Sequence, residues 1–158
     1  MNKKVIVAGL ALSLGILLPA GVQAKKITSS AQAEKLAKEY VKGATVLFTE
    51  EDEDDGIAVY EVDMKKGSKK YELVYQASNG KLIEYKWEKT GHKKGSKEIS
   101  EKEIKRQAKK KVKNASITEV DYDLEDAEYE VELITKNKKY ELDYSADGTL
   151  ISYKWEKF

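Results

Sequence analysis

Residues 81–89 read KLIEYKWEK, and residues 149–158, at the end of the chain, read TLISYKWEKF. The two stretches share the string YKWEK and contain both tryptophans of the protein. In each string the aromatic residues alternate with Lys and Glu, which is the period-two pattern of a β-strand with one apolar face. The duplication therefore predicts two equivalent strands.

The two strings belong to a longer repeat, which relates residues 29–89 to residues 100–157. The offset between the copies is 71 residues near the start and 68 residues near the end, because the second copy is slightly shorter. The deletions fall in an acidic segment and in the turn before the last strand, where loops tolerate changes of length. The repeat predicts two structural units of one type.

Each copy begins with the pattern of a capped helix. Ser29-x-x-Gln32 and Ser100-x-x-Glu103 are capping boxes, in which both side chains bind free amides of the first turn. In the first copy, apolar residues recur at helical spacing and form one stripe: Ala33, Leu36, Ala37, Tyr40 and Val41. The second copy keeps only Ile104, Ala108 and Val112 on this stripe. We therefore expect its helix to be less firmly packed.

The rest of each copy has the period-two pattern of half-buried strands. In the first copy the alternating residues are Ala58, Tyr60, Val62 and Met64, then Tyr71, Leu73 and Tyr75, then Ile83, Tyr85 and Trp87. Turns with Gly, Asn or Asp separate these segments, and a shorter strand is expected around residues 45–49 and 116–120. The sequence thus predicts an α+β fold of two repeats, each with one N-terminal helix packed on a three- to four-stranded antiparallel sheet.

The ends of the repeats suggest the organisation of the chain. Residues 1–24 have the basic start, the apolar run and the small residues before Ala24 that are typical of a signal peptide. Residues 90–97, TGHKKGSK, contain two glycines and no apolar residue, which indicates a linker. We predict a signal peptide at 1–24, repeat 1 at 25–89, a linker at 90–97 and repeat 2 at 98–158. The protein is then secreted or associated with the cell surface, without a transmembrane segment in its mature form.

Composition excludes several functions. The leader carries two lysines and no acid, so the remaining chain has 27 basic and 28 acidic residues and a net charge of −1. A nucleic-acid-binding protein would carry a clear basic excess. There is no cysteine, and the one histidine, His92, lies in the predicted linker, so disulfides, a zinc site and a Ser/His site lack their residues. The sequence predicts a protein that is not an enzyme and has no cofactor.

Two charged segments are candidates for ligand binding. The acidic run at residues 50–55, EEDEDD, offers the oxygen ligands that Ca²⁺ prefers, but lacks the alternating spacing that orders them around one ion. A solvated loop is the favoured interpretation. The basic run at residues 105–113 is either a solvated helix face or a site for anionic wall polymer or lipid headgroups. The candidate residues in it are Lys109, Lys110 and Lys111.

The aromatic residues of the two strings are candidates for a protein interface, because Tyr and Trp bury much surface at little entropic cost. These candidates are Tyr85, Trp87, Tyr153 and Trp155. The alternative is that they are core residues or cross-strand pairs. The two interpretations differ in which face of the sheet carries the tryptophans. The face under the helix is core, and the opposite face is open to a partner.

Both copies resemble the PepSY domain. The residues that carry the resemblance are Val59-Tyr60-Glu61-Val62, Tyr71-Glu72-Leu73 and Asn79-Gly80-Lys81-Leu82 in the first copy, and Tyr129-Glu130-Val131, Tyr140-Glu141-Leu142 and Asp147-Gly148-Thr149-Leu150 in the second. The first copy departs from the family pattern in having Val74 and Ser78 where the second has Asp143 and Asp147. PepSY domains are found in the propeptides of thermolysin-type metalloproteases, in spore-germination proteins and as free-standing exported proteins, often in tandem.

The resemblance implies a non-catalytic domain that binds and restrains a peptidase. We therefore expect a secreted module that binds a protein partner, an extracellular peptidase, through open sheet faces. The alternative is a cell-envelope protein that associates with anionic wall polymer or the membrane surface through the lysine-rich helix of repeat 2. A further arrangement has the two sheets forming one concave surface for a single globular target.

Overall fold

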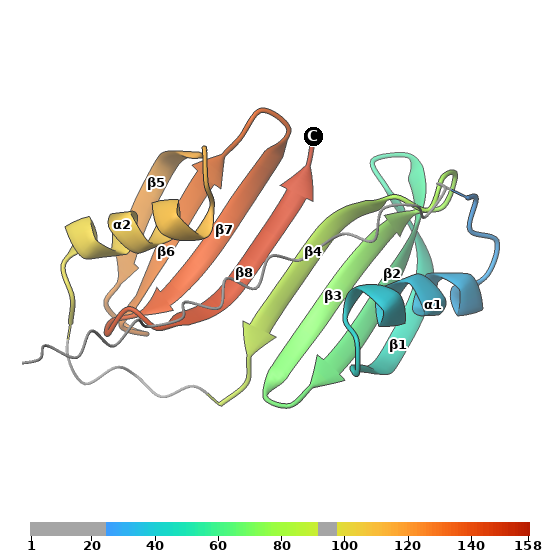
Figure 1. Cartoon of the computed structure of the whole chain (residues 1–158), viewed down its shortest axis with the longest axis horizontal. Coiled ribbons are helices and arrows are strands. Elements are labelled where there is room, and N and C mark those ends of the chain that lie inside the picture. Colours follow the sequence, from blue (N-terminus) through green and yellow to red (C-terminus); the bar gives the residue numbers. More distant parts are fainter. Residues whose placement is uncertain (1–24, 92–97) are drawn as a thin grey trace, which may run out of the picture.

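The computed structural model describes residues 25–91 and 98–158 (Figure 1). The predicted signal peptide and most of the predicted linker lie outside the described residues. Within the described part, each repeat consists of one helix followed by four strands. The elements of repeat 1 are α1 (Ser30–Tyr40), β1 (Thr45–Asp54), β2 (Ile57–Lys66), β3 (Lys69–Gln76) and β4 (Leu82–Lys89). Those of repeat 2 are α2 (Glu101–Lys111), β5 (Ser116–Asp123), β6 (Glu128–Ile134), β7 (Lys138–Ser145) and β8 (Leu150–Lys157).

All eight strands form one antiparallel sheet, in the order β1-β2-β3-β4-β8-β7-β6-β5 (Figure 1). The two halves join where β4 pairs with β8, with Tyr85 opposite Trp155 and Trp87 opposite Tyr153. The prediction of a separate three- to four-stranded sheet in each repeat is therefore wrong. The physical reason is that the last strand of each repeat would otherwise be an edge with unpaired backbone groups. Pairing the two YKWEK strands removes both edges at once.

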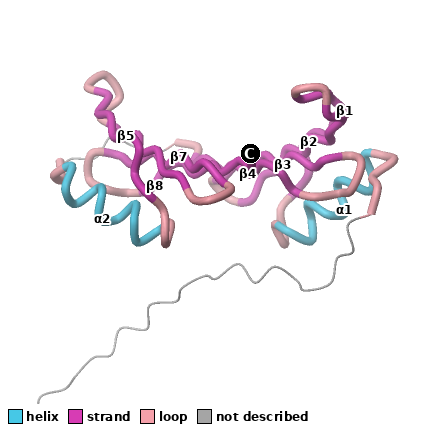
Figure 2. Tube along the Cα trace, turned by 90° about the horizontal axis from the view of Figure 1, so that it is seen from above, coloured by secondary structure: helices cyan, strands magenta, loops and turns pink. Residues whose placement is uncertain are grey.

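Both helices lie on the same face of the sheet, one over each outer half (Figure 2). α1 contacts β1 and β2, and α2 contacts β5 and β6. The opposite face carries no helix in the described part of the chain, and we call it the open face. The outer strands β1 and β5 bend away from the helices toward this side (Figure 2). Neither described helix is long and apolar enough to cross a membrane.

The core lies between the helices and the sheet. In repeat 1, Ala33 and Ala37 of α1 pack on a fully buried group formed by Val62, Met64 and Leu73. In repeat 2, Ile104 and Ala108 of α2 pack on Val131, Leu133 and Leu142. The expected weaker packing of α2 agrees with the structure, because α2 contacts its strands less extensively than α1 does and has no counterpart of Leu36 and Tyr40, which also pack on the core of repeat 1. The three stripe residues of α2 are nevertheless as deeply buried as their counterparts in α1. Ile104 of α2 occupies the position of Ala33 in α1, and its larger side chain partly compensates for the smaller number of apolar residues on α2.

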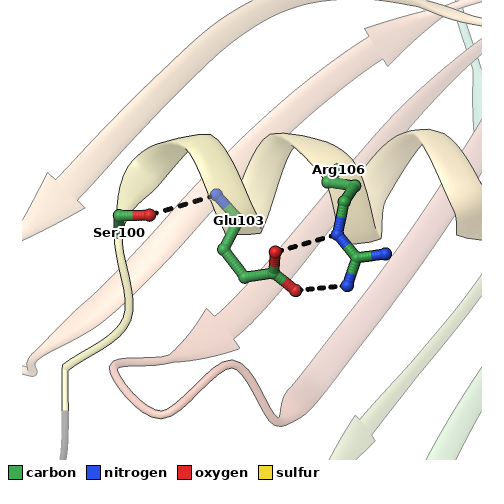
Figure 3. Close-up of polar contacts among 3 residues, drawn as sticks. All are labelled: Ser100, Glu103 and Arg106. Atoms are coloured by element: carbon green, nitrogen blue, oxygen red, sulfur yellow. Dashed lines mark hydrogen bonds and ion pairs between the residues drawn. The ribbon is translucent and has the colours of Figure 1, made fainter.

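The predicted capping box is half formed in α2 and is not formed in α1. In α2, Ser100 Oγ accepts a hydrogen bond from the Glu103 amide at 3.4 Å, while the Glu103 carboxylate binds Arg106 instead of the cap (Figure 3). In α1, Ser29 makes no side-chain cap, and the Gln32 side chain accepts a hydrogen bond from the Thr28 amide at 2.9 Å. The α2 bond satisfies an amide of the first turn, as a capping box would, whereas the α1 bond satisfies the amide before the cap residue.

Candidate functional site

The four candidate aromatic residues lie at the centre of the sheet, on the helix side. The rings of Trp87 and Tyr153 stack with centroids 6.5 Å apart, and those of Tyr85 and Trp155 lie 6.3 Å apart. Tyr40, at the end of α1, packs on Tyr85 with a centroid distance of 5.3 Å. Trp87 and Trp155 are only 7% and 6% exposed. The tryptophans therefore belong to the core that joins the repeats, and a direct role in partner binding stays a prediction.

Lysines from β3, β7 and the end of α2 lie over the aromatic rings. Lys69 Nζ lies 3.2 Å from the ring centroid of Trp87, and Lys138 Nζ lies 3.2 Å from that of Trp155. Lys111 Nζ lies 5.2 Å from the ring of Tyr153. Burial, together with the nearby Lys157 ammonium, lowers the pKa of Lys138 to about 8. These cation–π contacts shield the ring faces from solvent.

The three candidate lysines at the end of α2 differ in their contacts. Lys109 and Lys110 are exposed in the last turn of the helix, while Lys111 reaches the central aromatic cluster. Earlier in the helix, Lys105 pairs with Glu101, and Arg106 pairs with Glu103. Of the three lysine candidates, Lys109 and Lys110 are thus the ones available to an external anion.

The open face is lined by charged side chains, with carboxylates outnumbering lysines. Residues directly opposite each other in neighbouring strands share a face, and the register therefore places these residues on it: Glu61, Asp63, Lys65, Lys70, Glu72, Glu84, Lys86, Glu88, Glu128, Glu130, Glu132, Lys139, Glu141, Asp143, Lys154 and Glu156. At the junction of the repeats, Lys154 Nζ lies 3.2 Å from Glu84 and 3.5 Å from Glu156. A face rich in carboxylates favours a basic partner.

The two halves of the open face differ in how their carboxylates are neutralised. In repeat 2, Lys139 Nζ lies 2.6 Å from Glu132 Oε1 and 3.4 Å from Glu141 Oε1. The equivalent residue of repeat 1, Lys70, forms no ion pair with any described residue. In the described part of repeat 1, Asp63 and Glu72 therefore lack the lysine ion pairs that Glu132 and Glu141 have in repeat 2.

Three carboxylates of repeat 1 lie close together on the open face. One oxygen each from Glu61, Asp63 and Glu72 lies within 4.8 Å of the others. Burial raises the pKa of Glu61 to about 7, and the neighbouring carboxylates of Glu72 and Asp63 add to the effect. Such crowding disfavours ionisation of all three groups at once. A cation placed beside them would be held favourably.

The acidic run adds to this charge. Residues 50–54 form the second half of β1, so the expectation of a loop is wrong. The run extends as a hairpin strand because Asp55 and Gly56, with φ of 48° and 78°, make the tight two-residue turn to β2. Glu50 lies opposite Glu61 on the open face, while Glu51 accepts a hydrogen bond from the Tyr60 hydroxyl on the helix side. Carboxylates that alternate between faces cannot all converge on one ion.

An exposed apolar pair at the start of β1 was missed from the sequence pattern. Leu47 and Phe48 are 56% and 57% exposed. The register shifts between Val46 and Phe48, and this β-bulge places Phe48 opposite Asp63 on the open face. Leu47 lines a depression of about 230 Å³ together with Asp63, Lys70, Glu72, Lys86 and Glu88. Because a bulge interrupts the period of two, the pattern alone does not assign these side chains to a face.

The equivalent bulge in β5 has different side chains. Its register shifts between Ile117 and Glu119, and the residues that correspond to Leu47 and Phe48 are Thr118 and Glu119. Alignment of the two copies pairs Leu47 and Phe48 with the polar residues Thr118 and Glu119, and this difference could have identified the apolar pair from the sequence. The two sheet edges thus have similar backbones and different chemistry.

Comparisons with known proteins agree with this architecture. The profile of the PepSY family, described as peptidase propeptide and YPEB domain, matches residues 28–86 and 98–147. The search of curated proteins returned no match. Among solved structures, the YpeB C-terminal domain of Bacillus megaterium has a TM-score of 0.50 and 13% identity, and the alignment covers 82% of this chain and 63% of that one. At this identity the likeness shows the fold alone.

A second solved structure, a candidate lipoprotein from Clostridium difficile 630, aligns with a TM-score of 0.40 and 19% identity over 84% of this chain and 95% of that one. The two segments matched by the PepSY profile correspond to the two repeats. Together they cover more than half of the chain, and the protein therefore belongs to the PepSY family.

Proposed function

We propose that this chain is an exported, non-catalytic module that binds a protein partner, and that the partner is a peptidase. The family description, which includes peptidase propeptides, supports this class of partner. The PepSY domain generally serves as a propeptide or regulatory module and not as a catalyst. The predicted signal peptide supports export.

The observation that carries the proposal is the continuous open face. One sheet spans both repeats, and both helices lie on its other side, so that face is free for a partner (Figure 2). Its carboxylates favour a partner with a basic surface, because complementary charge steers association and selects among partners. The β4–β8 pairing makes the two halves of this face continuous, and the salt bridge from Lys154 to Glu84 crosses their junction.

The test uses residues 25–158 as bait for proteins of the culture supernatant, followed by activity assays on any peptidase recovered. A charge-reversed open-face variant, Glu72→Lys/Glu88→Lys, is compared with Glu34→Lys/Glu39→Lys, which makes the same charge change on α1. We expect the wild type to capture and slow a peptidase, with recovery reduced about tenfold in the open-face variant only. If no peptidase is enriched and none is slowed, the proposal fails.

A second candidate function is association with anionic wall polymer or a membrane surface. The observation that favours it is the exposure of Lys109, Lys110 and Lys113, none of which forms an ion pair within the described residues. Sedimentation with anionic vesicles and with isolated cell wall, at low and high salt, tests it. Binding that is lost at high salt and in Lys109→Glu/Lys110→Glu supports this function, and affinity that salt does not change contradicts it.

A further inference from the structure

We propose that the outer edge of β1 is a docking site for an extended segment of a partner protein, which adds a strand to the sheet and presents apolar and basic side chains to it. This inference rests on the proposed role in protein binding. It specifies the position of the contact and the chemistry of the segment.

The first observation concerns the backbone of the edge strands. β1 is the terminal strand of the sheet and pairs only with β2. Its outer backbone N–H and C=O groups form no strand pairing with described residues, and between residues 46 and 52 they can bind another strand, as in other complexes formed by strand addition. The Glu53 amide, farther along, donates to Asp52 Oδ1. β5 is the opposite edge and contains a β-bulge at the equivalent position. The backbone alone does not distinguish the two edges, so the difference must come from side chains.

The second observation is the apolar pair. Leu47 and Phe48 leave more than half of their surface exposed at the β1 edge, whereas the β5 edge has Thr118 and Glu119 in their place. Polar and charged residues at an edge discourage pairing with other chains. β5 has this protection at the bulge and β1 does not. An added strand with an apolar side chain beside Phe48 would cover this surface.

The third observation is the charge that follows the pair. Beyond Phe48, the open side of β1 presents Glu50 and Asp52, and Glu61 and Asp63 lie behind them on β2. β5 presents Asp121 and Asp123 at the equivalent positions, so this charge specifies the chemistry of the added strand, and the apolar pair is what distinguishes the two edges. Lys70 forms no ion pair with the described carboxylates of repeat 1, whereas Lys139 pairs with Glu132 in repeat 2. Cross-strand neighbours interact directly, so the added strand should carry Lys or Arg at alternating positions here. Burial and the repulsion of neighbouring carboxylates raise the pKa of Glu61, and these cations would relieve the repulsion.

The same charges disfavour a second copy of this chain as the occupant. An antiparallel pair of two β1 strands that overlap over their full length would place Leu47 and Phe48 opposite carboxylates of the acidic half. A parallel pair would place carboxylates opposite carboxylates, which is destabilising. The segment that fits is an alternating one, with basic residues at one end and apolar residues at the other.

The test uses residues 25–158 and fluorescent peptides of ten residues, the length of β1. In the basic probe, Thr occupies every second position, and the positions between carry three Lys followed by two Val. A second probe has the reverse order, and an acidic probe has Glu for Lys. We expect one basic probe to bind about tenfold more tightly than the acidic probe. Amide hydrogen exchange should slow at residues 46–52 and not at residues 117–123.

The matched variant is Leu47→Thr/Phe48→Glu, which introduces the residues of the β5 bulge. Because β5 already folds with these residues at the same kind of bulge, the variant should keep its circular dichroism spectrum and melting temperature. We expect it to bind the basic probe about tenfold more weakly. Leu124→Thr, which removes an apolar residue that is 85% exposed in the β5–β6 turn, should bind as the wild type does.

Four results would overturn the docking site. Neither basic probe binds, or the Leu47→Thr/Phe48→Glu variant binds the basic probe as tightly as the wild type does. Alternatively, the probe slows amide exchange in β5, or a higher protein concentration without any probe slows amide exchange in β1. The last would identify a second copy as the occupant. The proposed function is judged separately. If the double variant captures a peptidase as well as the wild type does, the edge site fails and the function stands. If the wild type captures no peptidase but still binds the basic probe through Leu47 and Phe48, the proposed function fails and the docking site stands.

Discussion

At the scale of single residues, the structure shows where local chemistry conflicts with the fold. Glu61 and its carboxylate neighbours are crowded on the open face, and their repulsion is a cost to the folded state at neutral pH. Gly80 has φ of 68°, and a Cβ built on it would lie 2.6 Å from the Lys25 carbonyl oxygen. Both residues support quantitative predictions, because each has a control elsewhere in the chain.

We predict that Glu61→Gln stabilises the protein at pH 8 and has little effect at pH 4. The folded-state pKa of Glu61 is raised from 4.5 to about 7, so the folded state binds the proton more tightly than the unfolded state does. The wild type therefore loses stability as pH rises from about 4.5 to about 7. Urea unfolding at both pH values measures the effect, with Glu53→Gln, at an exposed position of β1, as the control. A gain from Glu61→Gln that is the same at both pH values would contradict the assignment.

We predict that Gly80→Ala is more destabilising than Gly67→Ala. Both glycines have positive φ, 68° and 60°, so both substitutions carry the left-handed backbone cost of about 1–2 kcal/mol. Nothing lies within 4 Å of a Cβ at Gly67, whereas a Cβ at Gly80 meets the Lys25 carbonyl and must displace the segment before α1. Thermal unfolding of the two variants measures the difference. Equal losses would show that this close approach has no energetic weight.

At the scale of the elements, β4 and β8 are the strands on which the fold depends. They pair with each other, and their aromatic side chains fill the gap that α1 and α2 leave between them. The two copies of YKWEK act as one central layer of the core. A residue of this layer should therefore affect the stability of both repeats together.

We predict that Trp87→Ala destabilises the protein by about 3–5 kcal/mol, the usual cost of removing a buried large aromatic side chain. It loses the stacking on Tyr153 and the contact with Lys69. Trp155, the remaining tryptophan, reports unfolding by fluorescence. The control is Phe158→Ser, at a position that is 71% exposed, where we expect a change within about 0.5 kcal/mol. Similar small losses in both variants would contradict the core assignment of Trp87.

At the scale of the whole molecule, the protein is a pair of repeats that share one sheet. Its two edges, β1 and β5, are exposed, while the edges that would lie inside it are paired. The helix side is closed by packing and by lysines over the aromatic rings, and the open side presents carboxylates. This distribution of charge separates a structural side from a side that is free to bind.

We predict that residues 25–89 alone form a dimer through β4. An antiparallel β4–β4 pair would place Tyr85 opposite Trp87 and Lys86 opposite Lys86, which reproduces the Tyr85–Trp155 and Lys86–Lys154 pairs of the intact sheet. Sedimentation equilibrium measures the mass of the fragment. The Trp87→Arg fragment is the control, because a charge in the buried layer should prevent pairing. A folded monomer as stable as the intact chain would refute this account of the junction.

Much of this protein was predictable from its sequence, because local patterns determine local structure. The helices at residues 30–40 and 101–111 and the period-two strands follow from residue spacing, and the repeat implied that each copy has the same order of elements. The PepSY resemblance rested on those same strands, and the family match confirms it. These features depend on residues that are near each other in the chain.

The tertiary structure alone decided how the copies join and which face carries the tryptophans. A YKWEK strand has the same alternation whether it ends a separate sheet or pairs with its copy, so its sequence does not state its neighbour. The β4–β8 pairing decides both points, because it removes two exposed edges and makes the aromatic side chains one shared core layer. The apolar pair at Leu47 and Phe48 was likewise hidden, since the β-bulge that turns it to the open face exists only in the paired sheet.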